Sequence, residues 1–124
     1  MNPVQYVGLD IIEVCRIEEA VSRWGDRFLQ RVYTEKELGY CRGRSRSLAA
    51  RFAAKEAVAK ALGTGIGRIA FKDIEIVSGP RKQPHVVLRG RALSRSRRLG
   101  LTNLAISLSH CRDYAAASFV GGCS

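Results

Sequence analysis

The sequence predicts a single compact α+β domain over residues 1–124, with a mixed, largely antiparallel sheet and one long packed helix. The chain has 124 residues, 46% of them hydrophobic, which is enough for one domain with its own core. Segments with strand patterns and segments with helix patterns follow one another without regular alternation, which favours the α+β class. No internal repeat or low-complexity linker divides the chain.

The N-terminal half is predicted to hold one strand and three helices. Residues 4–12 are rich in β-branched and aromatic side chains, as is typical of a strand. A first helix is expected over residues 16–31, where apolar side chains recur at helical spacing. These apolar positions are Ile17, Ala20, Val21, Trp24, Phe28 and Leu29. A capping box at residues 34–37 starts a short helix, and a basic loop at 42–47 precedes a long alanine-rich helix at 48–62.

The C-terminal half is predicted to hold four strands and one more helix. A glycine-rich segment at residues 63–67 ends the long helix, and the pattern then changes to the alternation of a half-buried strand. In order, the expected elements are a strand (71–77), a turn (78–82), a strand (85–88), a helix (91–99) and two strands (104–109 and 114–120) joined by a turn (111–113).

The formal charge of +10 is large for a chain of this size and is unevenly distributed. Residues 1–20 hold one base and four acids, whereas residues 21–60 hold ten bases and four acids. Residues 61–100 hold nine bases and two acids, so the middle of the chain makes the positive field. Such a field attracts an acidic partner or ligand. On charge alone, nucleic acid, an acidic protein and a phosphate-rich cofactor all stay open.

The cysteines and the N-terminus indicate a reduced, cytoplasmic protein. No pair of cysteines has C-x-x-C spacing, which argues against a zinc knuckle or a thioredoxin-type site. The N-terminus lacks the features of a signal peptide, and no stretch approaches the roughly 20 apolar residues that span a bilayer. Four free thiols are then expected as small core hydrophobes, with a disulfide as the alternative. They are Cys15, Cys41, Cys111 and Cys123.

Asp10 and Glu56 are the candidate metal ligands. Asp10 lies in an otherwise apolar strand, so its carboxylate must be paired, metal-bound or at a strand end that faces water. Glu56 lies in the alanine-rich helix, where an ion pair with Lys60 is the alternative. Together the two carboxylates are suited to Mg²⁺, which takes one or two carboxylates along with waters and substrate phosphates. Mn²⁺ accepts the same oxygen ligands.

Basic side chains and a glycine-rich segment flank these carboxylates. Arg51, Lys55 and Lys60 are expected to pair with phosphates. The glycines of residues 63–67 would let the backbone approach a ligand closely, and Gly63 is also expected to cap the helix. A metal-bound polyphosphate is therefore the predicted ligand.

Four segments resemble motifs of the holo-acyl-carrier-protein synthase family, the small phosphopantetheinyl transferases. Residues 8–17 resemble its G-x-D-I-x-x-x-x-R-I motif, and residues 31–37 resemble its R-x-[FY]-T-x-x-E segment. Residues 51–66 resemble its signature helix and glycine loop, and residues 107–117 resemble its C-terminal motif. The resemblance covers nearly the whole chain in order. It departs at Cys111 and Gly39, and it is loose over residues 78–100.

This resemblance implies transfer of the 4′-phosphopantetheine arm of coenzyme A to a serine of apo acyl carrier protein, in support of fatty acid biosynthesis. The serine attacks the phosphorus that bears the pantetheine, and adenosine 3′,5′-bisphosphate leaves. By similarity, Asp10 and Glu56 hold Mg²⁺ at the pyrophosphate. Lys60 lies near the same pyrophosphate, where it either stabilises charge or helps the serine lose its proton. Glu56 acting through a water, or a water alone, are the other candidates for the general base.

The resemblance also implies binding residues and an oligomeric state. The coenzyme should contact Arg51, His110 and the backbone of the glycine loop, at Gly63, Thr64 and Gly65. Acyl carrier proteins are acidic around the modified serine, so basic residues of the first helix are the expected docking residues. They are Arg16, which the motif match carries, Arg23 and Arg27. Family members are usually trimers with active sites at subunit interfaces, so a homotrimer is expected.

Two alternatives stay open beside this function. The charge alone would suit a non-catalytic nucleic-acid-binding protein, but the few aromatics do not interleave with the basic runs and no known nucleic-acid module is visible. The prediction is therefore of no nucleic-acid partner and no membrane partner. A transferase dedicated to a polyketide or multidomain synthase is the second alternative, and the sequence does not rank the carrier proteins.

Overall fold

The computed structural model describes residues 4–79, 81 and 83–123. Its strands pair only antiparallel, which confirms the α+β class, and they form a three-stranded sheet of order β1-β5-β4 and a separate hairpin β2-β3. The elements are β1 (Gln5–Glu13), α1 (Val14–Trp24), α2 (Asp26–Val32), α3 (Glu35–Cys41), α4 (Ser45–Leu62), the 3₁₀ turn η1 (Phe71–Asp73), β2 (Ile74–Ser78), β3 (Pro84–Leu88), α5 (Gly90–Arg98), β4 (Asn103–His110) and β5 (Tyr114–Gly122).

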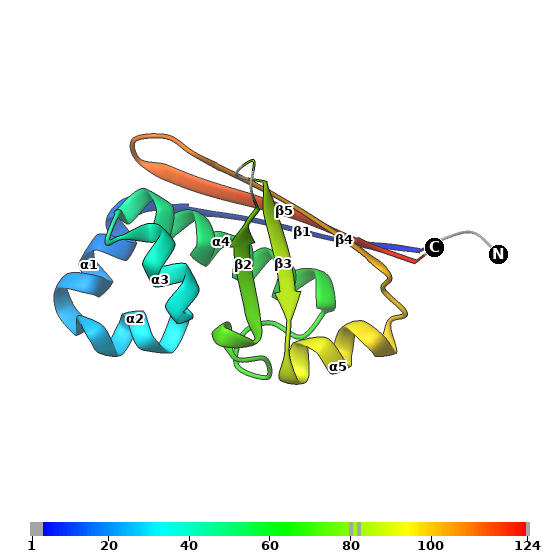
Figure 1. Cartoon of the computed structure of the whole chain (residues 1–124). Coiled ribbons are helices and arrows are strands. Elements are labelled where there is room, and N and C mark those ends of the chain that lie inside the picture. Colours follow the sequence, from blue (N-terminus) through cyan, green and yellow to red (C-terminus); the bar gives the residue numbers. More distant parts are fainter. Residues whose placement is uncertain (1–3, 80, 82, 124) are drawn as a thin grey trace.

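Helix α4 lies at the centre of the fold. It runs along the three-stranded sheet, with α1–α3 gathered at one end of the molecule and α5 at the other (Figure 1). Side chains of α4 share one apolar core with the sheet and with β2, and a second core with α1, α2 and α3. Because α4 is covered on most sides, its sequence is alanine-rich all round rather than striped. In the described part of the chain, no helix combines the length and apolar character needed to cross a bilayer.

Strand β1 rests directly on the backbone of α4. Its alternate residues face the helix, and among them Gly8 is buried. A Cβ atom at Gly8 would lie 1.7 Å from the carbonyl oxygen of Ala57, so only glycine fits there. Asp10 follows two residues later on the same face of the strand. The glycine thus brings the Asp10 carboxylate close to α4.

Three expected element boundaries were wrong. The predicted helix over 16–31 is two helices, because Gly25 takes a positive φ of 54° and its N–H closes α1 onto the carbonyl of Val21. The basic loop is shorter than expected, since α4 already begins at Ser45. The predicted strand 71–77 starts with η1, which the N–H of Asp73 closes onto the carbonyl of Ala70. In the predicted turn 78–82, positions 80 and 82 lie outside the described residues.

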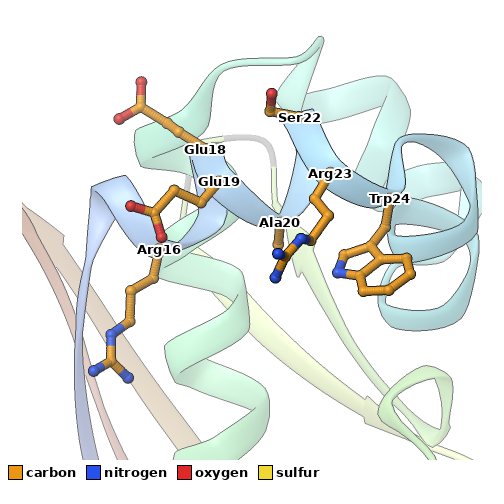
Figure 2. Close-up of a pocket in the computed structure, with 7 residues that line it drawn as sticks. All are labelled: Arg16, Glu18, Glu19, Ala20, Ser22, Arg23 and Trp24. Carbon is orange, nitrogen blue, oxygen red and sulfur yellow. The ribbon is translucent and has the colours of Figure 1, made fainter.

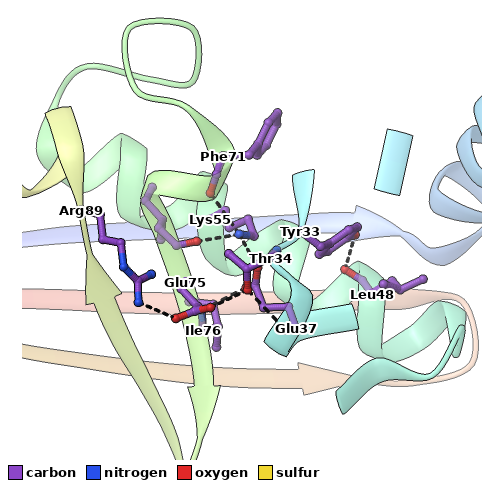
Figure 3. A network of polar contacts seen from close by, with 10 residues as sticks. Tyr33, Thr34, Glu37, Leu48, Lys55, Phe71, Glu75, Ile76 and Arg89 are labelled. Carbon is purple, nitrogen blue, oxygen red and sulfur yellow. Dashed lines mark hydrogen bonds and ion pairs between the residues drawn. The ribbon is translucent and has the colours of Figure 1, made fainter. Parts of the chain in front are cut away.

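Lys55 is a structural residue, so its expected pairing with phosphate was wrong. Its side chain has no exposed surface, and its ammonium group lies 2.8 Å from a carboxylate oxygen of Glu37. The same group donates to the carbonyls of Phe71 (3.0 Å) and Ile74 (2.6 Å). Figure 3 shows how this network joins α3, α4, η1 and β2. A buried ammonium needs such partners because leaving it unpaired is costly.

Glu37 holds the other side of this network. The predicted capping box is confirmed, because the N–H of Thr34 donates to Glu37 (2.9 Å) and the N–H of Glu37 donates to the Thr34 hydroxyl (3.3 Å). The second carboxylate oxygen of Glu37 accepts from the N–H of Ile76 (3.0 Å). A residue expected only to start a helix therefore also anchors β2.

The cysteines do not share one environment. All four are free, but only Cys41 is buried in the core. Cys15 and Cys111 are exposed, and Cys123 is half-buried. The expectation that all four cysteines lie in the core was thus wrong for the two exposed thiols.

Candidate active site

Asp10, Glu56 and Lys60 form a polar group where β1 crosses α4. The Lys60 ammonium lies 2.8 Å from a carboxylate oxygen of Asp10 and donates to the carbonyl of Leu9 at 3.1 Å. Glu56 is half-buried one helical turn before Lys60. Lys60 therefore forms its ion pair with Asp10 on the neighbouring strand. The alternative given above, an ion pair with Glu56 along the helix, was wrong.

The two carboxylates interact electrostatically. The pKa of Glu56 is raised, first by partial burial and then by the negative charge of Asp10, while Lys60 opposes the shift. The pKa of Lys60 is raised chiefly by its hydrogen bond to Asp10. Two carboxylates that repel each other beside a single ammonium leave net negative charge at this point. A further cation would relieve that repulsion.

The donor set suits a hard cation that keeps other ligands. Among the residues described, no cluster of three or more histidine, cysteine, aspartate or glutamate side chains could hold a metal by protein ligands alone. Two carboxylates are what Mg²⁺ commonly takes from a protein when waters and substrate phosphates fill its other positions. Asp10 and Glu56 thus fit the expected ion.

Arg51 and His110 line a second site. They border a hollow of about 270 Å³ that is also lined by Tyr40, Ser78 and Ser107. The guanidinium of Arg51 is nearly buried, lies 4.1 Å from the centre of the Tyr40 ring and donates to the Ser78 hydroxyl at 2.9 Å. Its Nε atom is buried without a hydrogen-bond partner. A guanidinium held in this way at a hollow is suited to bind an anionic group.

The two sites lie apart within one chain. Arg51 and Lys60 are nine residues apart on α4, about 13 Å along the helix axis. The structure thus brings together Asp10, Glu56 and Lys60, and separately Arg51 and His110. The hollow that Arg51 and His110 border is not lined by Asp10, Glu56 or Lys60 among the residues that the structure describes.

The glycine loop after α4 is first of all a helix cap. Gly63 has a φ of 76°, and its N–H donates to the carbonyl of Lys60 at 3.0 Å. The N–H groups of Thr64 and Gly65 both turn back to the carbonyl of Ala59 (3.4 and 3.3 Å). These N–H groups therefore already have hydrogen-bond partners within the loop, and the buried Thr64 hydroxyl has none among the described residues.

The predicted docking arginines lie on two helices. Arg16 and Arg23 are exposed on α1 and border one open hollow with Trp24 (Figure 2). Arg27 belongs to α2, beyond the bend at Gly25. Trp24, expected on the apolar core face, is instead 54% exposed, with the Arg23 guanidinium 5.9 Å from its ring centre. The exposure of Trp24 could have been predicted from the sequence, because an aromatic residue stands directly after an arginine at the end of the helix.

Comparisons with known proteins show the family to which the chain is similar. The family model of the 4′-phosphopantetheinyl transferase superfamily matches residues 6–118. A holo-[acyl-carrier-protein] synthase of Dehalococcoides mccartyi is 50% identical, over 93% of this chain and 96% of the relative. One from Moorella thermoacetica is 51% identical, over 89% and 88%. The crystal structure of the Helicobacter pylori holo-[acyl-carrier-protein] synthase in complex with coenzyme A superposes with a TM-score of 0.85 at 35% identity, over 93% of this chain and 98% of that one.

Proposed function

The chain belongs to the 4′-phosphopantetheinyl transferase superfamily, and on that premise we propose that Asp10, Glu56 and Lys60 are its catalytic residues. The reaction transfers 4′-phosphopantetheine from coenzyme A to a serine of apo acyl carrier protein. The serine oxygen forms the new bond to phosphorus, and adenosine 3′,5′-bisphosphate leaves with the old one. The observation that carries the assignment is the Asp10–Lys60 pair at 2.8 Å beside a second carboxylate.

Asp10 and Glu56 would hold Mg²⁺ as the resident cofactor, with Mn²⁺ as a substitute of the same ligand preference. When bound, the ion would neutralise charge on the pyrophosphate of coenzyme A during transfer. Support comes from the raised pKa of Glu56, which is caused first by partial burial and then by the negative charge of Asp10. The chain's own part is to hold the two carboxylates on facing elements, one on β1 and one on α4.

Lys60 acts in this proposal as a cation rather than as the general base. Its pKa is raised by its hydrogen bond to Asp10, so it stays protonated at neutral pH. The Lys60 ammonium, which is exposed apart from its pairing with Asp10, would interact with a phosphate of the coenzyme when the ion is bound. The serine proton then passes to water or, through a water, to Glu56, whose raised pKa suits it as a proton acceptor.

The nucleotide end of coenzyme A is assigned to Arg51 and His110, together with the loop at Gly63, Thr64 and Gly65. The guanidinium of Arg51 has spare hydrogen-bonding capacity at its hollow. Because this hollow lies about 13 Å along α4 from Lys60, the coenzyme would be bound between two subunits, with the metal site of one and the Arg51 hollow of the other.

A homotrimer would supply such interfaces. The outer face of β1 carries Val7, Leu9 and Ile11, which are 64–65% exposed. Val120 on the neighbouring strand β5 extends this apolar face. Exposed apolar patches of this kind mark interaction surfaces. Strand β1 is also an edge strand of its sheet, and proteins usually cover such edges.

The acidic acyl carrier protein would dock at α1, through Arg16 and Arg23, with Arg27 of α2 beside them. Trp24 offers an apolar contact beside Arg16 and Arg23, in a hollow that Glu18 and Glu19 also line. A basic surface speeds and orients the encounter with an acidic partner, and added salt weakens it.

A cytoplasmic location and a role in fatty acid biosynthesis belong to the same proposal. All four cysteines are free thiols, which suits a reducing compartment. The phosphopantetheine arm is the group that carries growing acyl chains, so holo acyl carrier protein is an input of fatty acid biosynthesis.

The test is to incubate the protein with coenzyme A, Mg²⁺ and apo acyl carrier protein and to weigh the carrier by mass spectrometry. The wild type should add one phosphopantetheine group, and a chelator should abolish the gain. Glu56→Gln should lose transfer, whereas Glu35→Gln, which removes an exposed acid from α3, should keep it. Transfer by Glu56→Gln at the wild-type rate would refute the metal assignment.

A further inference from the structure

Helix α5 carries an arginine-rich groove that the transfer reaction does not use. The helix and the loop before η1 border a hollow of about 420 Å³. Its lining consists of four arginines, two hydroxyl residues and one buried apolar side chain, namely Arg68, Arg91, Arg95, Arg98, Ser94, Thr64 and Ile69, of which only Thr64 also belongs to the loop assigned to coenzyme A. Figure 1 shows α5 at the opposite end of the molecule from α1, so this groove is separate from the proposed carrier-protein surface.

The four guanidinium groups are not neutralised by the protein. Across residues 4–79, 81 and 83–123, none of them forms an ion pair with a carboxylate, and no acid lines the hollow. Arg95 is instead fixed by a hydrogen bond from its Nε to the carbonyl of Leu62 (2.9 Å), and Arg91 donates to the carbonyl of Arg68 (3.5 Å). These carbonyl partners orient the side chains of Arg91 and Arg95 but carry no full negative charge that would neutralise the guanidinium groups.

The placement of the arginines does not follow from helix stability. Arg91, Arg95 and Arg98 lie at i, i+4 and i+7, on one face of α5 over about 10 Å. A cation near the C-terminus of a helix is stabilised by the helix dipole, which accounts for Arg95 and Arg98. Arg91 lies in the first turn, where the same dipole disfavours it, and Arg68 lies across the groove. Like charges gathered in this way indicate a bound anion.

We propose that this groove binds a small molecule with a polyphosphate chain, of nucleotide size, at a site separate from the Arg51–His110 hollow. Three guanidinium groups in a row suit successive phosphates, and Ile69 offers an apolar surface beside them. The hollow has the volume of a small-ligand site. The site goes beyond the transfer reaction and does not depend on the metal assignment.

The test measures binding of inorganic tripolyphosphate by calorimetry, with adenosine triphosphate as a second probe that separates a nucleotide ligand from an inorganic one. Arg91→Gln with Arg98→Gln should raise the tripolyphosphate Kd on the order of tenfold, because each exposed charge contact contributes a factor of about three. The matched control is Arg97→Gln with Arg42→Gln, which removes two exposed charges outside the groove and should leave the Kd nearly unchanged. His110→Gln should also leave it unchanged.

Three results would overturn the proposal. The first is the absence of saturable tripolyphosphate binding by the wild type. The second and third are a loss of tripolyphosphate affinity in the control double variant, or in His110→Gln, as large as the loss in Arg91→Gln with Arg98→Gln. A rise in the KM for the carrier protein in Arg91→Gln with Arg98→Gln, with tripolyphosphate binding intact, would assign the arginines to protein docking instead. Because the assay needs neither metal nor carrier protein, its outcome is independent of whether the transferase assignment holds.

Discussion

Lys60 forms its ion pair with Asp10, so a divalent cation that binds Asp10 competes with this ammonium group. Replacing Lys60 with methionine should therefore separate two effects. We expect kcat to fall about a hundredfold, because charge on the leaving phosphate loses a stabilising cation. The Mg²⁺ affinity should stay the same or increase, since the competitor is gone. Metal titrations of the transfer rate give both quantities, and a loss of Mg²⁺ affinity in Lys60→Met would contradict this role.

Glu56 should set the acid limit of metal binding. Its pKa is raised, mainly by burial and then by Asp10, and a carboxylate binds metal only above its pKa. On acidification, Mg²⁺ affinity should therefore begin to fall at a pH above the ordinary glutamate value of about 4.3. Carbon-13 NMR titration of Glu56 measures the group directly. In Asp10→Asn the Glu56 pKa should drop, because a repelling charge is lost, and an unchanged pKa would count against the proximity of the two carboxylates.

At the scale of elements, the contact between β1 and α4 decides where Asp10 lies. Gly8→Ala places a Cβ against the carbonyl oxygen of Ala57, a backbone atom that cannot rotate away. We expect a loss of about 1–3 kcal/mol in the free energy of unfolding, as for overpacked cores, and a fall in transfer because Asp10 moves away from Lys60. Gly39→Ala is the control, since nothing lies within 4 Å of its added Cβ and alanine favours helix α3. Urea unfolding and the mass assay measure the two effects, and wild-type stability of Gly8→Ala would refute the tight contact.

The Lys55–Glu37 pair joins α3 and α4 to β2, and it should be needed for stability rather than for chemistry. Lys55→Met leaves the Glu37 carboxylate buried with fewer partners, which should cost about 3–5 kcal/mol in the free energy of unfolding. Adding Glu37→Gln should recover part of this loss, because the glutamine side chain is neutral. Urea unfolding of the single and double variants makes the comparison. A Lys55→Met protein that is stable but inactive would instead give Lys55 a direct role in transfer.

The elements that the sequence predicted well are those with a local signal. The capping box at Thr34 and Glu37 and the β-branched and aromatic residues of β1 are local signals, so both elements were found. The break at Gly25 was missed because the apolar spacing continues across it. The burial of Lys55 was missed because its partner is 18 positions away and on another helix. Asp10 and Glu56 were paired from their chemistry and from the resemblance to the family, whereas the pairing of Lys60 with Asp10 across to β1 appears only in three dimensions.

At the scale of the whole molecule, the two groups of site residues require a partner subunit if the proposed assembly is correct. The metal residues Asp10 and Glu56 would then work with the Arg51 hollow of a neighbour. Glu56→Gln and Arg51→Gln should each be inactive alone, and mixed oligomers obtained by co-expression should regain activity. Recovery should reach at most about a quarter of the wild-type rate, because random pairing joins two intact halves at one interface in four. The mass assay on purified mixed oligomers measures it.

This experiment needs a control for assembly, because the mixture tests nothing if the subunits do not associate. Leu9→Glu places a charge on the apolar outer face of β1, where 65% of the leucine is exposed in the single chain. It should reduce the oligomer to monomers in light scattering and abolish the recovery, whereas Gln30→Glu, which adds the same charge on exposed α2, should do neither. If Leu9→Glu stays active as a monomer, a single chain completes its own site, and α4 must then span both halves of the coenzyme by itself. Recovery of activity in the mixed oligomers, together with loss of activity in Leu9→Glu, would instead show that transfer requires the subunit contact made by the exposed face of β1. That contact would bring the Arg51 hollow of one subunit to the Asp10–Glu56 pair of the next.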